Sequence, residues 1–269
     1  MSLIRLALNL GDRMQKLLSI GSNPKINKSD KSGQGYKTAI LHLSPYKLSG
    51  RNLCPDASEG CIAGCLNTAG HGRFDKTQNA RLKRTLLFIK DKDEFMTRLI
   101  KEIGAFEKHC KKRDLKPCIR LNGTSDIPWE NVTLNHWTLF ELFPNVQFYD
   151  YTKSKRRVLK KSLPSNYHLT YSRSETTKTE DIRQVLDSGN NVAIVFDRIV
   201  NGPIHMFKKD LTGAFDKVID GDKTDLRFLD PSGVVVALSA KGKAKQDKSG
   251  FVVPMSLNKW DEFNARLNK

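Results

Sequence analysis

The sequence predicts an α/β protein whose parallel sheet forms an incomplete (β/α) barrel. Three observations favour this fold class. Short β-rich runs alternate with helical patterns, several of these runs are apolar on both faces, and polar residues follow the ends of several runs. We expect a single barrel-like domain over residues 37–269, preceded by an N-terminal helix and a flexible basic arm over residues 1–36.

The arm is predicted from the composition of its second half. Gly21–Tyr36 is rich in Lys, Ser, Gly and Asn and contains Pro24, which is typical of a linker. Met1–Leu18 is basic and only moderately apolar, and no small-residue cleavage site follows it. We therefore expect no secretory signal and a cytoplasmic location.

Six runs have the length and composition of strands, and helical patterns lie between them. The expected strands are Thr38–Leu43, Cys118–Leu121, Val146–Tyr151, His168–Tyr171, Val192–Phe196 and Val234–Leu238. A capping pair, Asp91 with Glu94, predicts the start of one helix. The expected helices span about Asp75–Ile89, Asp91–Phe106, Pro128–Leu142, Thr177–Gly189 and Leu257–Leu267.

Charge gives the first indication of function. The chain has 46 Lys and Arg against 29 Asp and Glu, which gives a formal net charge of +17. This surplus favours a polyanionic partner, DNA or RNA, through counterion release, although a basic protein without such a partner has the same composition. No apolar run approaches the roughly 20 residues that cross a bilayer, so we expect no membrane span.

Three of the five cysteines lie in one short loop. Cys54, Cys61 and Cys65 have the spacing C-x6-C-x3-C. Three thiolates from one loop could hold three irons of a [4Fe–4S] cluster and leave the fourth iron open. Zinc is the alternative, with His71 as a fourth ligand, and reduced cysteines packed as small apolar groups are a third. Cys110 and Cys118 are expected in the core.

Two other segments are candidates for binding or catalysis. Gly70, His71 and Arg73 form a candidate cofactor-binding turn, because glycines let a ligand approach the backbone and Arg73 offers a fork for phosphate. A plain exposed turn is the alternative. Asn122 and Asp126 lie in a loop that directly follows a strand.

We interpret Asn122, Asp126 and Asp150 as catalytic residues at the mouth formed by the strand ends. Ser125 or Asp126 acting only as a helix N-cap is the alternative. A weaker interpretation is a metal-dependent nuclease in which Asp126, Asp150 and Asp197 hold a divalent cation.

A dense basic run follows the third expected strand, with tyrosines before and after it. Basic side chains could hold a nucleic-acid backbone while tyrosines stack on bases, whereas a solvated helix face is the usual alternative. The candidate nucleic-acid contacts are Lys153, Lys155, Arg156, Arg157, Arg173 and Arg198.

Two motifs carry a resemblance to a known family. They are Cys54-Pro55 with Cys61, Cys65-Leu66 and Asn67-Thr68-Ala69-Gly70, and Arg120-Leu121-Asn122-Gly123-Thr124-Ser125-Asp126-Ile127-Pro128-Trp129-Glu130. Over about Thr38–Gly250 the chain resembles the phage-encoded gene product 88-like proteins. The resemblance implies a phage protein inside an infected bacterial host and specifies little about activity.

The cysteine loop is also loosely similar to the cluster loop of radical S-adenosylmethionine enzymes, which use a (β/α) barrel. Those enzymes typically have the spacing C-x3-C-x2-C, and no glycine-rich S-adenosylmethionine motif is visible in this chain. The similarity therefore implies a cluster more than it implies S-adenosylmethionine. The lack of cysteines after Cys118 argues against a second cluster.

Two hypotheses about function follow from these patterns. In the first, a phage-type protein binds an iron–sulfur cluster and acts on, or binds, nucleic acid or a nucleotide. In the second, a non-enzymatic nucleic-acid-binding or host-takeover protein uses the same scaffold, with zinc or no metal on its cysteines.

Overall fold

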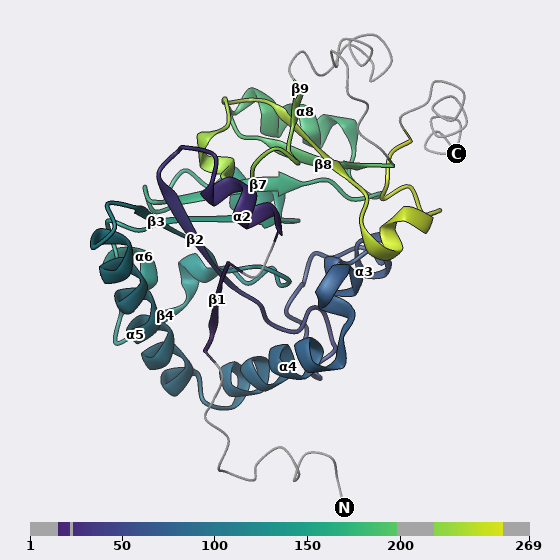
Figure 1. Ribbon diagram of the computed structural model, residues 1–269. Helices are drawn as coiled ribbons and strands as arrows, with labels where there is room; N and C mark the ends of the chain where they lie inside the picture. The colour runs from purple at the N-terminus through teal and green to yellow at the C-terminus, as the bar shows by residue number, and fades with distance from the viewer. Residues whose placement is uncertain (1–15, 22–23, 198–217, 255–269) are drawn as a thin grey trace, which may run out of the picture.

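The computed structural model describes residues 16–21, 24–197 and 218–254. An eight-stranded sheet organises this part of the chain, in the order β1-β2-β3-β6-β7-β8-β10-β9 (Figure 1). The strands are β1 (Leu18–Ile20), β2 (Tyr36–Leu41), β3 (Lys116–Arg120), β6 (Gln147–Thr152), β7 (Tyr167–Ser172), β8 (Val192–Phe196), β9 (Val218–Asp220) and β10 (Val235–Ser239). Neighbours are parallel except β1 and β2, which pair antiparallel.

The six strands predicted from the sequence are all present, and they lie side by side in chain order from β2 to β10. Such an order lacks the reversal that defines a doubly wound sheet. It is the order that successive βα units give when each crossover turns the same way, as in a barrel. Among the described residues no pairing joins β1 to β9, so the structure is a mostly parallel open sheet.

Long helices cover one face of this sheet. α4 (Asp75–Lys90), α5 (Lys92–Lys111) and α8 (Thr179–Asp187) lie where the sequence predicts them, around the outside of the strands (Figure 1). The Asp91 carboxylate accepts a hydrogen bond from the Glu94 N–H at 3.0 Å, which caps α5. Gly189 follows α8 at φ +84°, a conformation that favours glycine and ends the helix.

The expected helix over Pro128–Leu142 is wrong in most of its length. A 3₁₀ turn (Trp129–Asn131) leads into a small hairpin of β4 (Thr133–Leu134) and β5 (Trp137–Thr138), and only α6 (Leu139–Leu142) is helical. Asn135 and His136 have φ of 48° and 71°. Two successive positive φ values make a type I′ hairpin turn, which the apolar spacing of this segment did not reveal. The expected helix over Leu257–Leu267 lies outside the described residues.

The expected linker over Gly21–Tyr36 is replaced in part by regular structure. α2 (Pro24–Asp30) begins at a proline, which suits a first helical turn. The Asp30 carboxylate accepts hydrogen bonds from Lys37 Nζ at 2.7 Å and from the Thr38 N–H at 3.1 Å, and so ties α2 to β2. In the described part of the chain, no helix has the length and apolarity needed to span a membrane.

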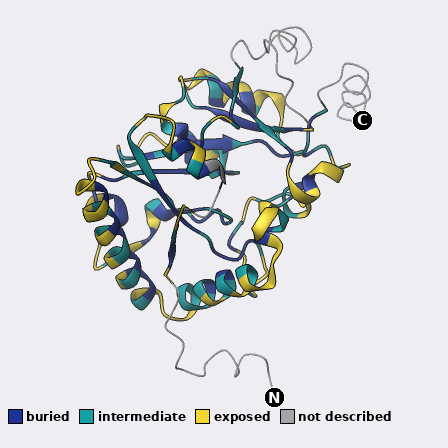
Figure 2. Ribbon diagram, viewed as in Figure 1, coloured by how far each residue is buried: buried dark blue, intermediate teal, exposed yellow. Residues whose placement is uncertain are grey.

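Strand alternation gives the sheet two different faces. The helix face carries Ile119, Phe148, Leu169 and Ile194 in one large apolar core that also contains the inner sides of α5 and α8. Buried strands lie between helices whose outward sides are exposed (Figure 2). We call the opposite side the inner face. It carries Cys118, Arg120, Tyr149, Tyr151, His168 and Lys153.

Candidate functional site

The carboxyl ends of β3, β6 and β7 meet at one edge of the sheet, as predicted. The Lys153 N–H, directly after β6, donates to Asp126 Oδ2 at 2.8 Å. The Lys153 ammonium reaches β7, where it donates to Ser172 Oγ at 2.9 Å and to the Arg173 carbonyl at 2.7 Å. The loops after the three strands are therefore held together by direct hydrogen bonds.

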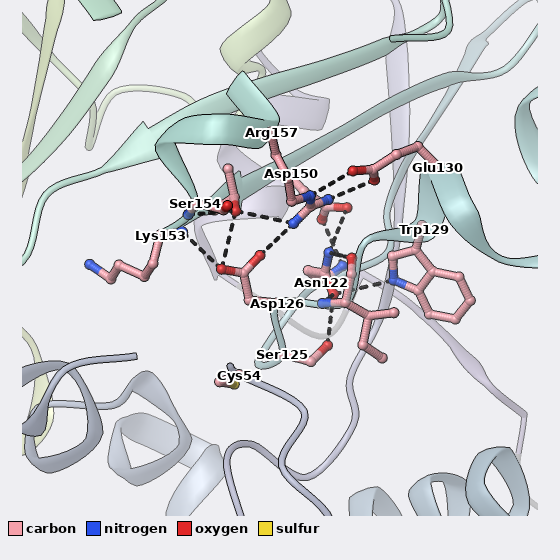
Figure 3. A network of polar contacts seen from close by, with 12 residues as sticks. Cys54, Asn122, Ser125, Asp126, Trp129, Glu130, Asp150, Lys153, Ser154 and Arg157 are labelled. Atoms are coloured by element: carbon pink, nitrogen blue, oxygen red, sulfur yellow. Dashed lines mark hydrogen bonds and ion pairs between the residues drawn. The ribbon is translucent and has the colours of Figure 1, made fainter. Parts of the chain in front are cut away.

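Asn122 is the centre of a buried network at this edge (Figure 3). Its Oδ1 accepts from Ser125 Oγ at 2.9 Å, from the Ile127 N–H at 2.9 Å and from Trp129 Nε1 at 3.2 Å. Its Nδ2 donates to the Ile127 carbonyl at 2.9 Å and to Asp150 Oδ2 at 3.2 Å. One side chain thus fixes the whole turn between β3 and the Trp129 segment.

Arg157 joins two acidic side chains in the same network. Its Nη1 lies 2.6 Å from Asp126 Oδ1, and its Nε and Nη2 make a two-pronged contact with Glu130 at 2.7 and 2.8 Å. All three residues are largely buried. Such a buried and geometrically complete pairing leaves Arg157 without a free edge for another anion.

Asp150 is the most deeply buried carboxyl group of the site. It accepts from the Asn122 N–H at 2.6 Å and from the Tyr167 hydroxyl at 2.9 Å. Burial raises its pKa to about 7, because the charged form loses its hydration. Burial also raises the pKa of Asp126, against the opposing effect of Arg157.

The three predicted catalytic residues are thus brought together, but by hydrogen bonds to the protein itself. Asn122, Asp126 and Asp150 are 2%, 7% and 0% exposed. This geometry gives them a positioning role in the strand-end turn, and a catalytic role stays a prediction. Asp197 is exposed after β8, and no three His, Cys, Asp or Glu side chains among the described residues lie close enough to hold a metal ion. The nuclease interpretation therefore gains no preformed cation site.

The cysteine loop lies against this edge of the sheet. Cys54, Cys61 and Cys65 are half-buried, whereas Cys110 and Cys118 are buried in the core, as predicted. Cys61 lies in the short helix α3 (Glu59–Ala63), and Cys65 caps the 3₁₀ turn Leu66–Thr68. The Tyr46 N–H donates to Cys54 Sγ at 3.3 Å. The three thiols of the loop are therefore partly exposed, whereas the thiols of Cys110 and Cys118 are enclosed by the core.

The thiols of the loop lie within electrostatic range of one another and of two cations. Burial raises the pKa of each thiol, that of Cys54 to about 12. The charges of Cys61 and Cys65 contribute to the raised pKa of Cys54, while Lys153 lowers that of Cys61. Arg81 lowers the pKa of Cys65 in the same way. The three sulfur atoms are not grouped closely enough to hold a metal ion as the described residues stand.

Glu175 fastens α3 to the end of β7. Its carboxylate accepts from Ser58 Oγ at 2.6 Å and from the Gly60 N–H at 2.7 Å. A Cβ at Gly60 would lie 2.2 Å from Ser249 Oγ and 2.7 Å from Phe251 Cβ. Only glycine therefore lets the helix approach so closely, and Cys61 is positioned by this contact.

The predicted cofactor turn forms a 3₁₀ helix over Gly70–Arg73 whose side chains point outward. His71 and Arg73 are exposed, together with Phe74 at 51%. The Arg73 guanidinium carbon lies 5.5 Å from the centre of the Phe74 ring, and the His71 ring lies 5.8 Å from it. These residues form an exposed aromatic and basic rim beside the cysteine loop.

The basic run does not form one continuous nucleic-acid surface. Lys155 pairs with Asp181 at 2.5 Å, Arg157 is enclosed by its carboxylates, and Arg173 donates to the Gly250 carbonyl at 2.8 Å. Arg156 is exposed. Arg198 lies outside the described residues. Contact of Lys153, Lys155, Arg157 and Arg173 with nucleic acid would compete with these intramolecular bonds.

Sequence reasoning gave no role to several residues that the structure brings to this region. Arg120 and Tyr151 lie on the inner face, and Arg81 of α4 lies within electrostatic range of His42, at the end of β2. Period-two alternation could have placed Arg120 with Cys118, and Tyr151 with Tyr149, on one face of the sheet. No pattern in the sequence pairs either strand with Arg81, because α4 is far away in the chain.

Comparison with known proteins gives one match. The model of a family described as gene product 88 matches residues 16–254. A search of curated proteins and of solved structures finds no match. The similarity to radical S-adenosylmethionine enzymes thus receives no support.

Proposed function

The chain belongs to the gene product 88 family, and from this premise we propose that it binds an iron–sulfur cluster and acts on a nucleotide or nucleic acid. The match supports the phage family that the two motifs indicate, and it leaves the activity to be argued from the site. The observation that carries the proposal is the position of Cys54, Cys61 and Cys65, which lie against the edge where the carboxyl ends of the parallel strands meet.

The chemistry of the donor set suits a metal centre. In the protein alone, burial favours the protonated form of each thiol. A bound metal supplies the positive charge that lets buried thiols ionise. Lys153 and Arg81 add positive charge beside Cys61 and Cys65, which suits a cluster that carries net negative charge with its thiolates.

Binding requires the loop to close, because the thiols do not yet converge. Cys54, Cys61 and Cys65 would hold three irons, and a cluster bound in this way supplies one-electron chemistry or an open iron for a ligand. The surrounding residues contribute position. Glu175 fixes α3, and the Asn122 network fixes the turn that follows β3.

Anaerobic purification with iron and sulfide analysis tests this proposal. We expect about four irons per chain and a broad visible absorbance after reconstitution. The variants Cys54→Ser, Cys61→Ser and Cys65→Ser should each lose most of the iron, whereas Cys110→Ala, in the core, should keep it.

A colourless protein without iron after reconstitution would remove the cluster. Stoichiometric zinc in its place would favour the alternative of a zinc-binding scaffold. Equal iron loss in Cys110→Ala would show that the cysteine variants act through folding and not through ligation.

One observation favours a second candidate function, nucleic-acid binding without catalysis. Phe74 is exposed and has the Arg73 guanidinium beside its ring, next to His71. An exposed ring with a neighbouring cation is the arrangement on which single-stranded bases stack. This function needs no metal, so it survives if the cysteines hold none.

A further inference from the structure

The inner face of the sheet carries polar groups in its middle layer. Alternation places Cys118 and Arg120 of β3, and Tyr149 and Tyr151 of β6, on this face. The layer of the inner face that contains Cys118 and Tyr149 is filled by other side chains. Leu226 packs with Cys118 and Tyr149, and the Tyr149 hydroxyl donates to Asp225 Oδ2 at 3.1 Å. Arg120 and Tyr151 lie above this filled layer, toward the cysteine loop.

Three buried donor atoms in this region have no hydrogen-bond partner. They are Arg120 Nε, Arg81 Nε and the Tyr151 hydroxyl. Buried polar groups in folded proteins are almost always paired, since an unpaired one loses its hydration without compensation. Arg120 Nη1 makes one longer contact, 3.4 Å to Asp225 Oδ2, and the charge of Asp150 also acts on Arg120.

One contact and one shared neighbour place these groups near one another. The Arg120 guanidinium carbon lies 4.7 Å from the centre of the Tyr151 ring. His42, at the end of β2, lies within electrostatic range of both arginines: burial, together with the charges of Arg81 and Arg120, lowers its pKa to about 3. Arg81 Nη1 donates to Asn67 Oδ1, and the guanidinium lies under Gly72 and near Cys65, so Arg81 also belongs to the cysteine loop.

The ligand that fits these groups has oxygen acceptors and negative charge. Guanidinium groups only donate hydrogen bonds, and they match phosphate oxygens in a planar fork. Leu226 fills the neighbouring part of the inner face, and Arg81 lies within electrostatic range of Cys65 in the cysteine loop. Because the unpaired donor atoms are buried, a single phosphate group suits them better than a duplex or a folded polymer.

We propose that Arg120, Tyr151 and Arg81 form an anion site on the inner face that takes the phosphate of a small nucleotide. The inference rests on the proposed function for the nucleotide part of the ligand. It narrows the substrate class from nucleic acid in general to a mononucleotide whose phosphate enters below the cysteine loop. The phosphate contact itself requires no metal.

Calorimetric titration with adenosine monophosphate and with inorganic phosphate tests the site in the full-length protein. Tyr151→Phe removes a hydroxyl that has no partner, so the unfolding temperature of the free protein should stay equal or rise. Affinity for both anions should fall about tenfold, the usual effect of losing one hydrogen bond to a charged group. Arg120→Gln should abolish detectable binding.

Tyr149→Phe is the matched control, because it lies two residues away on the same face but has a protein partner. It should lower the unfolding temperature and leave the affinity unchanged. Binding of adenosine monophosphate but not of inorganic phosphate would place the recognition on the nucleoside and overturn the anion site. Equal affinities in wild type and Tyr151→Phe would also overturn it.

The two proposals fail in distinguishable ways. Phosphate binding that depends on Tyr151 in a protein free of iron would retain the anion site and remove the cluster. Iron in the purified protein without phosphate binding would do the reverse.

Discussion

Asn122 shows how one residue determines the conformation of a strand end. Its side-chain oxygen and nitrogen make four hydrogen bonds within the turn that leads from β3 to Trp129 and a fifth to Asp150 on β6. Asparagine suits this position because its short side chain offers both a carbonyl oxygen and an amide nitrogen. Aspartate has nearly the same shape but lacks the donor. The Trp129 indole, fully buried, depends on this oxygen for its N–H.

Replacing Asn122 with Ala should therefore destabilise the fold strongly. The buried Ile127 N–H and the Trp129 indole N–H would lose their acceptor, and each orphaned group costs about 1–3 kcal/mol. We expect a loss of about 3 kcal/mol or more in the free energy of unfolding, measured by urea denaturation. A loss below about 1 kcal/mol would contradict the positioning role, and Asn131→Ala, on the exposed side of the turn, is the control.

The raised pKa of Asp150 predicts how the stability of the fold depends on pH. Its pKa in the folded protein is about 7, above the usual value of 3.8, so the folded state binds the proton more tightly than the unfolded state. The stability that this proton confers is complete below about pH 4 and is lost as the pH rises to about 7, by up to about 4 kcal/mol.

Two histidines change the stability of the fold in the opposite direction over the same range of pH. Burial lowers the pKa of His42 to about 3 and that of His168 to about 4, so both destabilise the fold as the pH falls below about 6.5. The effect of Asp150 is therefore isolated by comparing the unfolding free energies of wild type and of a variant that lacks this carboxyl group. The unfolding free energy of wild type minus that of Asp150→Asn should fall between pH 4 and pH 7, and a flat difference would contradict the raised pKa.

At the scale of the element, the cysteine loop depends on a contact from a different strand. α3 has only five residues, too few to be stable alone, and the Glu175 carboxylate accepts hydrogen bonds from its N-cap Ser58 and from its first turn at Gly60. The loop is therefore a unit that can open without unfolding the sheet.

Glu175→Ala should release this unit selectively. We expect faster amide hydrogen exchange in residues 58–65, with unchanged exchange in α5, and a lower iron content because the loop closes less often around the metal. Glu180→Ala, exposed on α8, is the control. Unchanged exchange in residues 58–65 would show that the loop is held by other contacts.

At the scale of the whole molecule, the positive charge predicts how any nucleic-acid binding responds to salt. The affinity for a single-stranded oligonucleotide should fall at least about tenfold between about 50 and 200 mM salt. The exposed cations that remain in the basic run after the intramolecular pairs are formed include Arg156, Lys160 and Lys161.

Changing these three cations to Gln should reduce the salt dependence, by about 0.7 in the logarithmic slope for each phosphate contacted. The same change at Lys108, Lys111 and Lys112, exposed near the end of α5, alters the net charge equally and is the control. Equal effects of both triple variants would show that net charge, and not a local surface, determines binding.

The sequence by itself determined the strand pattern, the long helices and the division of the cysteines. Local periodicity is sufficient for these features, because a strand such as Val192–Phe196 or a capped helix such as α5 carries its signal within its own residues. It also placed Asn122, Asp126 and Asp150 at one edge, since parallel strands bring their carboxyl ends together.

Only the tertiary structure decided what those residues do there. Arg157 is part of a basic run in the chain, yet it lies buried between Asp126 and Glu130, which are 31 and 27 residues away. The approach of Arg81 and Arg120 to His42 is likewise invisible in the sequence, because it brings together a helix and two strands that are far apart in the chain. Pairings over such separations depend on how whole elements pack, and no local pattern of residues encodes them.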